Sequence, residues 1–186
     1  MSIKIGVLAL QGAFIEHEQM LNHLGVQCVE LRQKKDLDTD YQGLILPGGE
    51  STVQTKLLKE LDMYDTIKAQ IESGMPVLGT CAGMILLVDT FKTFPGEVKR
   101  NAYGRQLGSF NVNAEVKGIG NIPMTFIRAP YMTAAGEGVN ILSVVDDKIV
   151  AAQYGNQVAL AFHPEVTGDE SVHKYYLELV NEFCNS

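Results

Sequence analysis

Cysteine is scarce in this sequence, and the cysteines that are present lie far apart. The 186-residue chain carries three, Cys28, Cys81 and Cys184, with no C-x-x-C pair. An odd number at such wide spacing does not build a disulfide framework and fits a reducing compartment. We therefore expect a cytoplasmic protein.

Long apolar runs are also missing. No segment approaches the ~20 consecutive apolar residues that a membrane-spanning helix needs. The apolar start, residues 1–10, contains Lys4 and is too short for a signal peptide with a cleavage site. We expect neither a membrane partner nor export.

Positive charge is limited as well. Fifteen basic residues stand against 22 acidic ones, which gives a net charge of -7 with the basic residues scattered. This disfavours a nucleic-acid partner.

The glycines form neither G-x-x-x-x-G-K-[ST] nor G-x-G-x-x-G, so a phosphate or dinucleotide site is weakly supported. The histidines do not indicate a metal site.

The apolar content is sufficient for one core. With 46% hydrophobic residues and no repeats or linkers, the chain can bury roughly 70% of its unfolded surface. We expect a single domain over residues 1–186.

The first half of the sequence alternates apolar strands with amphipathic helices. The predicted order is a strand over 3–10, a helix over 14–24, a strand over 26–31, a strand over 44–46, a helix capped by Ser51 or Thr52 and running through Leu58, a helix over 64–73 and a strand over 77–78. Such alternation predicts a flavodoxin-like α/β fold, a three-layer sandwich with a mostly parallel central sheet. Its functional loops gather at the carboxyl ends of the strands.

From about Phe91 onward, short β-branched and aromatic runs replace the helices. This half is predicted to form mixed or antiparallel strands, with a hairpin between 149–153 and 158–162 around a loop of Gly and Asn. An apolar stripe over 172–183 predicts a closing helix.

The most informative motif is a cysteine at a glycine-rich corner, residues 79–83, Gly-Thr-Cys-Ala-Gly. A lone cysteine is usually a small buried hydrophobe. Here the G-x-C-x-G spacing, between an apolar strand and a helix, is typical of a nucleophile elbow. The start of a helix also favours a negatively charged sulfur. We interpret Cys81 as a nucleophile, and Cys28 and Cys184 as non-catalytic.

A base and a carboxylate follow the apolar stretch 158–162. His163 and Glu165 alternate around a proline, so both side chains can lean toward the same face. Histidine after a strand is commonly only solvated, but together with the elbow the pair predicts a Cys-His-Glu triad. The other three histidines, His17, His23 and His173, are interpreted as solvated or packing residues.

The segment 47–51, Pro-Gly-Gly-Glu-Ser, follows a predicted strand. Taken alone it is best explained as a turn and a helix cap. Its functional interpretation is an oxyanion hole formed by backbone N–H groups of Gly49 and Ala82.

Six segments together resemble one family, the glutaminase subunit of pyridoxal 5′-phosphate synthase, within the triad-type (class I) glutamine amidotransferases. They are 6–13 (Gly-Val-Leu-Ala-Leu-Gln-Gly-Ala), 46–52 (Leu-Pro-Gly-Gly-Glu-Ser-Thr), 79–83, 100–106 (Arg-Asn-Ala-Tyr-Gly-Arg-Gln), 126–130 (Phe-Ile-Arg-Ala-Pro) and 162–165 (Phe-His-Pro-Glu). The elbow and His-Pro-Glu are shared across the wider class, whereas the other segments are specific to this subunit.

The resemblance implies a class I amidotransferase-like fold and specific roles. Cys81 would be the nucleophile, His163 the base and Glu165 its orienter. Glutamine would contact Gly49, Glu50, Ser51, Arg105, Ile127 and Arg128. A guanidinium can hold the α-carboxylate of glutamine by forked hydrogen bonds, and both Arg105 and Arg128 are candidates.

The resemblance further implies that the chain hydrolyses L-glutamine and hands the ammonia to a synthase subunit that makes pyridoxal 5′-phosphate. No metal or cofactor is needed for this half-reaction. The partner would complete the oxyanion hole, so low activity alone is expected. Two alternatives stay open: a stand-alone cysteine hydrolase of γ-glutamyl compounds, and a non-catalytic regulatory binder on the same scaffold.

Two departures from the family are visible. The segment 89–99 is shorter than the loop and strand usual there, and Tyr131 and Met132 follow 126–130 in place of a histidine and an aliphatic residue. Both lie near the predicted pocket.

Overall fold

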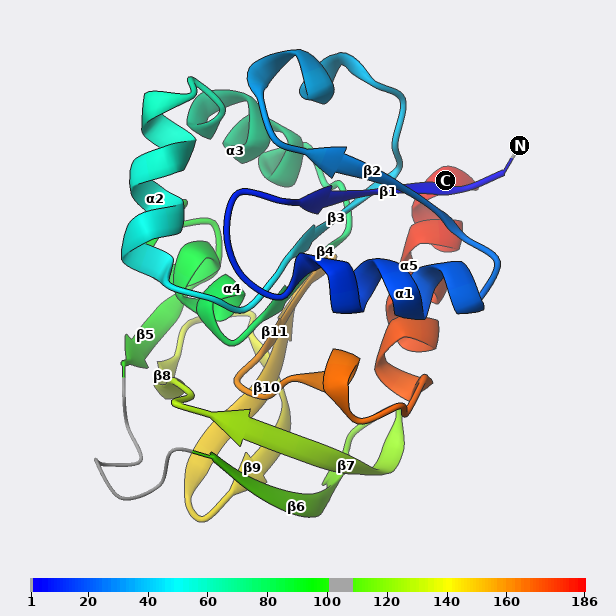
Figure 1. Cartoon of the computed structure of the whole chain (residues 1–186). Coiled ribbons are helices and arrows are strands. Elements are labelled where there is room, and N and C mark those ends of the chain that lie inside the picture. The colour runs from blue at the N-terminus through cyan, green and yellow to red at the C-terminus, as the bar shows by residue number, and fades with distance from the viewer. Residues whose placement is uncertain (1, 101–108) are drawn as a thin grey trace.

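The computed structural model describes residues 2–100 and 109–186 (Figure 1). In the first half the elements are β1 (Lys4–Leu8), α1 (Phe14–His23), β2 (Gln27–Leu31), η1 (Lys34–Asp38), β3 (Gly43–Leu46), α2 (Ser51–Glu60), α3 (Tyr64–Glu72), β4 (Val77–Thr80), α4 (Ala82–Ile85) and the π-helical turn η2 (Leu86–Thr90). In the second half they are β5 (Gly96–Lys99), β6 (Ser109–Val116), β7 (Gly120–Ile127), β8 (Tyr131–Ala135), β9 (Asn140–Val145), β10 (Lys148–Tyr154), β11 (Gln157–Leu160), η3 (Pro164–Val166) and α5 (Ser171–Cys184).

Nine strands of the described residues form one sheet, in the order β2-β1-β3-β4-β11-β10-β8-β5 with β9 beside β10. The first five run parallel. Strands β3, β4 and β11 are buried throughout, as parallel strands covered on both faces must be. The order 2-1-3-4 is that of a flavodoxin-like sheet, so the predicted fold class is confirmed.

Helices cover both faces of the parallel strands. Figure 1 shows α1 and α5 on one side, and α2, α3 and α4 on the other. On the first side, Tyr176 of α5 donates a hydrogen bond from its hydroxyl to the backbone oxygen of Leu44 at 2.9 Å. This bond anchors α5 on the sheet and satisfies the hydroxyl, which is fully buried.

The predicted hairpin forms with a tighter loop than expected. Tyr154 pairs with Gln157, so only Gly155 and Asn156 lie between the two strands. Gly155 has φ 56°, which a two-residue turn of this kind requires and glycine adopts without strain.

Strand β11 also pairs in parallel with β4, a placement that the hairpin pattern does not reveal. Leu160 lies beside Thr80, and the backbone N–H of Cys81 donates to the backbone oxygen of Leu160 at 2.7 Å. Because the two strands end together, the segment after β11 emerges next to the corner after β4. This pairing brings His163 to Cys81 across 82 positions of sequence.

A separate two-stranded sheet, β6 and β7, lies below these strand ends in Figure 1. Phe126 of β7 packs edge-on against Phe162 with ring centres 5.8 Å apart. The backbone N–H of His163 donates to the backbone oxygen of Thr125 at 2.8 Å. The pair β6 and β7 thus forms one wall beside the ends of the parallel strands.

The capping prediction was wrong: the residue before α2 is Glu50, no side chain caps the helix, and Ser51 already lies within it. The shortened segment 89–99 still contains strand β5, at the edge of the sheet beside β8. Of the helices that the structure describes, none has the length and apolar character to cross a bilayer.

Candidate active site

Cys81 occupies the corner between β4 and α4, with backbone angles φ 52° and ψ -106° that non-glycine residues rarely adopt. The neighbouring glycines make this corner possible. A Cβ atom on Gly83 would lie 2.0 Å from the backbone oxygen of Leu46, and one on Gly79 would lie 2.8 Å from the backbone oxygen of Gly83. The strain is held by close packing on both sides, as at a nucleophile elbow.

His163 and Glu165 lie next to this corner. Nδ1 of His163 is 2.5 Å from Oε1 of Glu165, and both side chains are buried. The imidazole also interacts with the thiol of Cys81, whose Sγ lies 3.8 Å from the backbone oxygen of Ile127. The structure therefore brings together the three side chains of the predicted triad.

The ionised forms of His163 and Glu165 stabilise each other. Burial lowers the pKa of His163, but its hydrogen bonds to Cys81 and Glu165 and their charges outweigh burial and raise the pKa to about 10. Burial raises the pKa of Glu165, but the histidines around it, with the hydrogen bond to His163, hold that pKa below its ordinary value. At neutral pH the pair is an imidazolium beside a carboxylate.

Two histidines that the sequence analysis assigned to packing or solvent continue this group inward. His17 of α1 and His173 of α5 are fully buried, with Nδ1 of His17 2.9 Å from Nε2 of His173. Nε2 of His17 lies 3.1 Å from Oγ1 of Thr80 and 3.5 Å from Oε2 of Glu165. The available signal was their position: each histidine falls on the apolar stripe of its helix, where a polar side chain needs a partner.

A cavity of about 530 Å³ opens in front of Cys81, within the range of small-molecule sites. Of the residues predicted from the sequence, those that line it are Gly49, Glu50, Ser51, Cys81, Ala82, Ile127, Arg128 and His163. Glu165 lies behind His163, and Arg105 falls outside the described residues. Lining residues that the sequence analysis did not predict are Gly12, Ala13, Gly48, Thr52, Ile85, Arg100 and Pro130.

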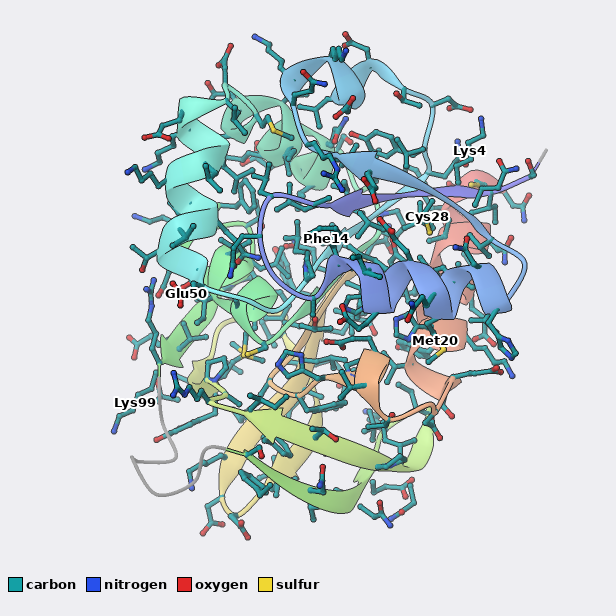
Figure 2. All side chains as sticks on the ribbon, viewed as in Figure 1. Lys4, Phe14, Met20, Cys28, Glu50 and Lys99 are labelled. Atoms are coloured by element: carbon teal, nitrogen blue, oxygen red, sulfur yellow. The ribbon has the colours of Figure 1, made fainter. Side chains whose placement is uncertain are left out.

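The turn 47–51 is clamped between the loop after β1 and the triad. The backbone N–H of Glu50 donates to Oε1 of Gln11 at 2.7 Å, and that of Ala13 donates to the backbone oxygen of Gly48 at 2.9 Å. A Cβ atom on Gly12 would lie 1.9 Å from the same oxygen, so the motif Leu-Gln-Gly-Ala needs its glycine for this close crossing. Figure 2 labels Glu50 at the start of α2, where the turn ends.

Backbone donors are available at the corner. Ala82 is the first residue of its helix, so its N–H has no partner within the helix. Arg128 has φ 46° and, like Cys81, combines an unusual backbone with a place on the cavity wall. Such outliers gather at functional sites.

Among the described residues, no group of three or more His, Cys, Asp and Glu side chains is arranged to hold a metal ion.

Comparison with known proteins gives one consistent result. Residues 7–182 match the SNO glutamine amidotransferase family. The chain is 53% identical to the pyridoxal 5′-phosphate synthase subunit PdxT of Desulfitobacterium hafniense (strain Y51), over 97% of this chain and 94% of the relative. It is 54% identical to the protein of that name in Haemophilus influenzae (strain PittGG), over 95% and 98% of the two chains.

Solved structures agree. A crystal structure described as a glutamine amidotransferase superposes with a TM-score of 0.89 at 40% identity, covering 95% of this chain and 98% of the other. PurLQS from Thermotoga maritima superposes with a TM-score of 0.76 at 18% identity over 99% of this chain and 100% of the other, a likeness of fold alone. The predicted amidotransferase-like fold is therefore confirmed.

Proposed function

Since the chain belongs to the SNO glutamine amidotransferase family, we propose that it hydrolyses L-glutamine to L-glutamate and ammonia and supplies the ammonia to the synthase subunit of pyridoxal 5′-phosphate synthase. The observation that carries this proposal is the meeting of Cys81 and His163 at the wall of one cavity, with Glu165 bound to His163 behind it. These are a nucleophile, a base and an orienting carboxylate.

The first step is attack of the Cys81 sulfur on the side-chain carboxamide carbon of glutamine. A protonated His163 beside the sulfur favours the thiolate, which is the nucleophilic form. The carbonyl oxygen becomes an oxyanion, which the N–H groups of Gly49 and Ala82 receive. One such donor is typically worth ~10²–10³ in rate.

The second half of the reaction uses the same imidazole twice. His163 gives its proton to the departing amine, so that ammonia leaves and a γ-glutamyl thioester forms on Cys81. The neutral imidazole then takes a proton from water, which attacks the thioester and releases glutamate. Glu165 keeps Nδ1 of His163 as a donor, so that the other ring nitrogen faces the reacting atoms.

Glutamine is held by the walls of the cavity. Glu50, Ser51 and Ile127 line it, and Arg128 offers a guanidinium. A guanidinium pairs with a carboxylate through two parallel hydrogen bonds, which fixes the α-carboxylate of the substrate. Arg105 remains the second candidate for this contact.

The partner and the compartment follow from the proposed reaction. Free ammonia is lost to solution, so an ammonia-producing subunit is useful only when docked to the enzyme that consumes it. The synthase condenses the ammonia with a pentose phosphate and a triose phosphate. We place this complex in the cytoplasm, with the glutaminase as one domain over residues 1–186.

The test is a reconstitution with the purified synthase subunit, L-glutamine and the two sugar phosphates. Glutamate release should be low for this chain alone and rise when the synthase is added. Cys81→Ala should abolish both glutamate release and glutamine-dependent pyridoxal 5′-phosphate formation, while an ammonium salt restores the latter. Cys28→Ala is the matched control and should behave as wild type. Equal glutamate release with and without the synthase would refute the coupling, and unchanged turnover by Cys81→Ala would refute the mechanism.

A further inference from the structure

The carboxylate that orients His163 has one oxygen without a regular partner. Oε1 of Glu165 contacts Nδ1 of His163, whereas Oε2 is buried and makes no regular hydrogen bond within the described residues. A buried carboxylate oxygen without a donor is costly. Nε2 of His17 lies 3.5 Å from this oxygen.

His17 lies on α1 and faces Oε2 of Glu165, the oxygen that does not contact His163. The α1 and α5 helices lie on the same side of the sheet (Figure 1), which lets His173 reach the inner nitrogen of His17. The groups that face His17 are Glu165 and His163 from the segment after β11, His173 from α5 and Thr80 from β4, while Glu16 of its own helix acts on it through charge.

Neither inner histidine carries a charge at neutral pH. Burial lowers the pKa of His17, and burial together with the neighbouring His17 lowers the pKa of His173 to about 3. Each neutral imidazole has one N–H and one bare nitrogen. The pair therefore has two arrangements, which differ in the direction of the hydrogen bond between the rings.

In one arrangement Nδ1–H of His17 donates to His173. Nε2 of His17 is then bare and can accept from the hydroxyl of Thr80 at 3.1 Å, but its lone pair also lies 3.5 Å from the anionic Oε2 of Glu165. His173 is left with a buried N–H at Nδ1, which has no partner among the described residues. Both consequences are unfavourable: a lone pair meets a negative charge, and a buried donor is orphaned.

In the other arrangement Nε2–H of His173 donates to Nδ1 of His17. Nε2–H of His17 then lies between Oγ1 of Thr80 at 3.1 Å and Oε2 of Glu165 at 3.5 Å, and can be shared by both. The carboxylate gains a donor, and the only unpartnered ring atom is a bare nitrogen of His173. The charge on Glu165 therefore selects this arrangement.

We propose that His17 is a positioning residue of the glutaminase. His173 fixes the tautomer of His17, and Nε2–H of His17 holds Oε2 of Glu165, the carboxylate that in turn orients His163. This inference rests on the proposed function, because orientation of His163 matters only if that imidazole transfers protons. His17 itself touches neither the reacting atoms nor the cavity. Groups that orient the ligands of a metal site in the same way are typically worth ~10–100-fold in activity, and we expect an effect of that size here.

The first test does not depend on activity. Long-range proton–nitrogen NMR correlation of the 15N-histidine-labelled protein at pH 7 should show His17 as the neutral Nε2–H tautomer. A bare Nε2 on His17, or an imidazolium at this pH, would overturn the inference even if the protein hydrolyses glutamine.

The second test compares amide substitutes in the synthase complex. Glutamine can place its N–H near the position of the imidazole Nε2, whereas asparagine reaches only the position of Nδ1. His17→Asn should lower kcat about 10–100-fold with little change in KM. The acid limb of its pH profile, where kcat/KM falls, should move to higher pH, because Glu165 loses a hydrogen-bond donor and takes up a proton more readily. His17→Gln should recover part of kcat and return the limb toward wild type.

The control is His23→Gln, on the same helix, whose side chain is 74% exposed; it should match wild type. Rates are divided by the fraction of protein that is folded, measured by circular dichroism. Equal kcat and equal acid limbs for the asparagine and glutamine variants would overturn the positioning role. If wild type itself releases no glutamate, the proposed function fails instead, and the NMR result still decides the tautomer.

Discussion

His163 and Glu165 stand two positions apart in the chain and are joined by a 2.5 Å contact between Nδ1 and Oε1. The proline between them begins a short helical turn, η3, which also contains Glu165. Together with the hydrogen bond to Cys81, this contact keeps the imidazole charged well above neutral pH, since the two raise the pKa of His163 to about 10.

Replacement of the orienting carboxylate should impair catalysis without removing the nucleophile. For Glu165→Gln we expect kcat in the synthase complex to fall ~10²–10⁴-fold, as when the carboxylate of a triad becomes an amide. The pKa of His163 should fall from about 10, because one of the groups that raises it is lost. The measurement is kcat together with the titration of His163 by NMR.

The control for this variant is Glu170→Gln, which removes a carboxylate from a surface ion pair with Lys174. It should leave both readings unchanged. A titration midpoint of His163 that stays near 10 in Glu165→Gln would show that the carboxylate does not hold the proton.

Arg128 should control substrate affinity more than turnover. Arg128→Lys keeps the positive charge but loses the pair of parallel N–H donors that a guanidinium offers to a carboxylate. One hydrogen bond to a charged group is worth ~1.5–3 kcal/mol. We expect KM for glutamine to rise ~10–100-fold with kcat nearly constant in initial-rate kinetics. Arg32→Lys, at an exposed ion pair with Glu30, is the control. An unchanged KM would exclude Arg128 from the contact with the α-carboxylate.

Gly48 should tolerate no side chain. A Cβ atom there would lie 2.3 Å from Cε1 of His163 and 3.3 Å from Cβ of Cys81. Either the imidazole or the turn must shift, so Gly48→Ala should lower kcat ~10²-fold or more, the cost of misplacing a catalytic group by about 1 Å. Steady-state glutamate release in the complex measures this effect.

Gly155→Ala is the matched control for Gly48→Ala. It has φ 56° and open space around its Cα, so alanine should cost ~1–2 kcal/mol of stability from the backbone alone. Its kcat should not change. Wild-type turnover by Gly48→Ala would mean that the turn is not packed against the imidazole in the working enzyme.

The buried histidine pair should make the fold sensitive to mild acid. The pKa of His173 is about 3 in the folded protein and 6.5 in a free histidine. Its contribution to stability is therefore present above pH 6.5 and is lost as pH falls toward 3, because the unfolded state takes up the proton first. Between pH 7 and pH 5 the loss from this group is about 2 kcal/mol.

Urea unfolding at the two pH values measures this loss. His173→Gln should be less stable than wild type at pH 7, but its loss between pH 7 and pH 5 should be smaller by about 2 kcal/mol. Val172→Ala, which truncates the buried neighbour on α5, should be destabilised yet keep the wild-type loss. An equal loss in His173→Gln and wild type would contradict the buried neutral state.

Much of the site could be predicted from sequence because its chemistry lies in short local motifs. The glycines around Cys81 permit the sharp corner, the proline between His163 and Glu165 restricts the chain there, and the structure has the three side chains meeting. The same holds for the parallel strands, whose apolar runs are long enough to indicate burial on both faces.

Other features depended on tertiary contacts that no local pattern encodes. His17 and His173 are 156 positions apart, and their pairing arises only because α1 and α5 share one face of the sheet. The insertion of β11 beside β4 is likewise set by the sheet and not by its hairpin. The residue types of Ser51 and Thr52 predict a cap, but the chain enters α2 through Glu50, whose N–H is already bound by Gln11.

The central claim is that Cys81 is the nucleophile toward glutamine, and covalent labelling tests it most directly. The synthase complex is treated with a chloroketone analogue of glutamine, and the modified residue is located by peptide mass spectrometry. We expect one adduct, on Cys81, which forms more slowly when L-glutamine is present and is absent from Cys81→Ala. Modification of Cys28 or Cys184 instead, or labelling of Cys81 that saturating glutamine does not slow, would contradict it.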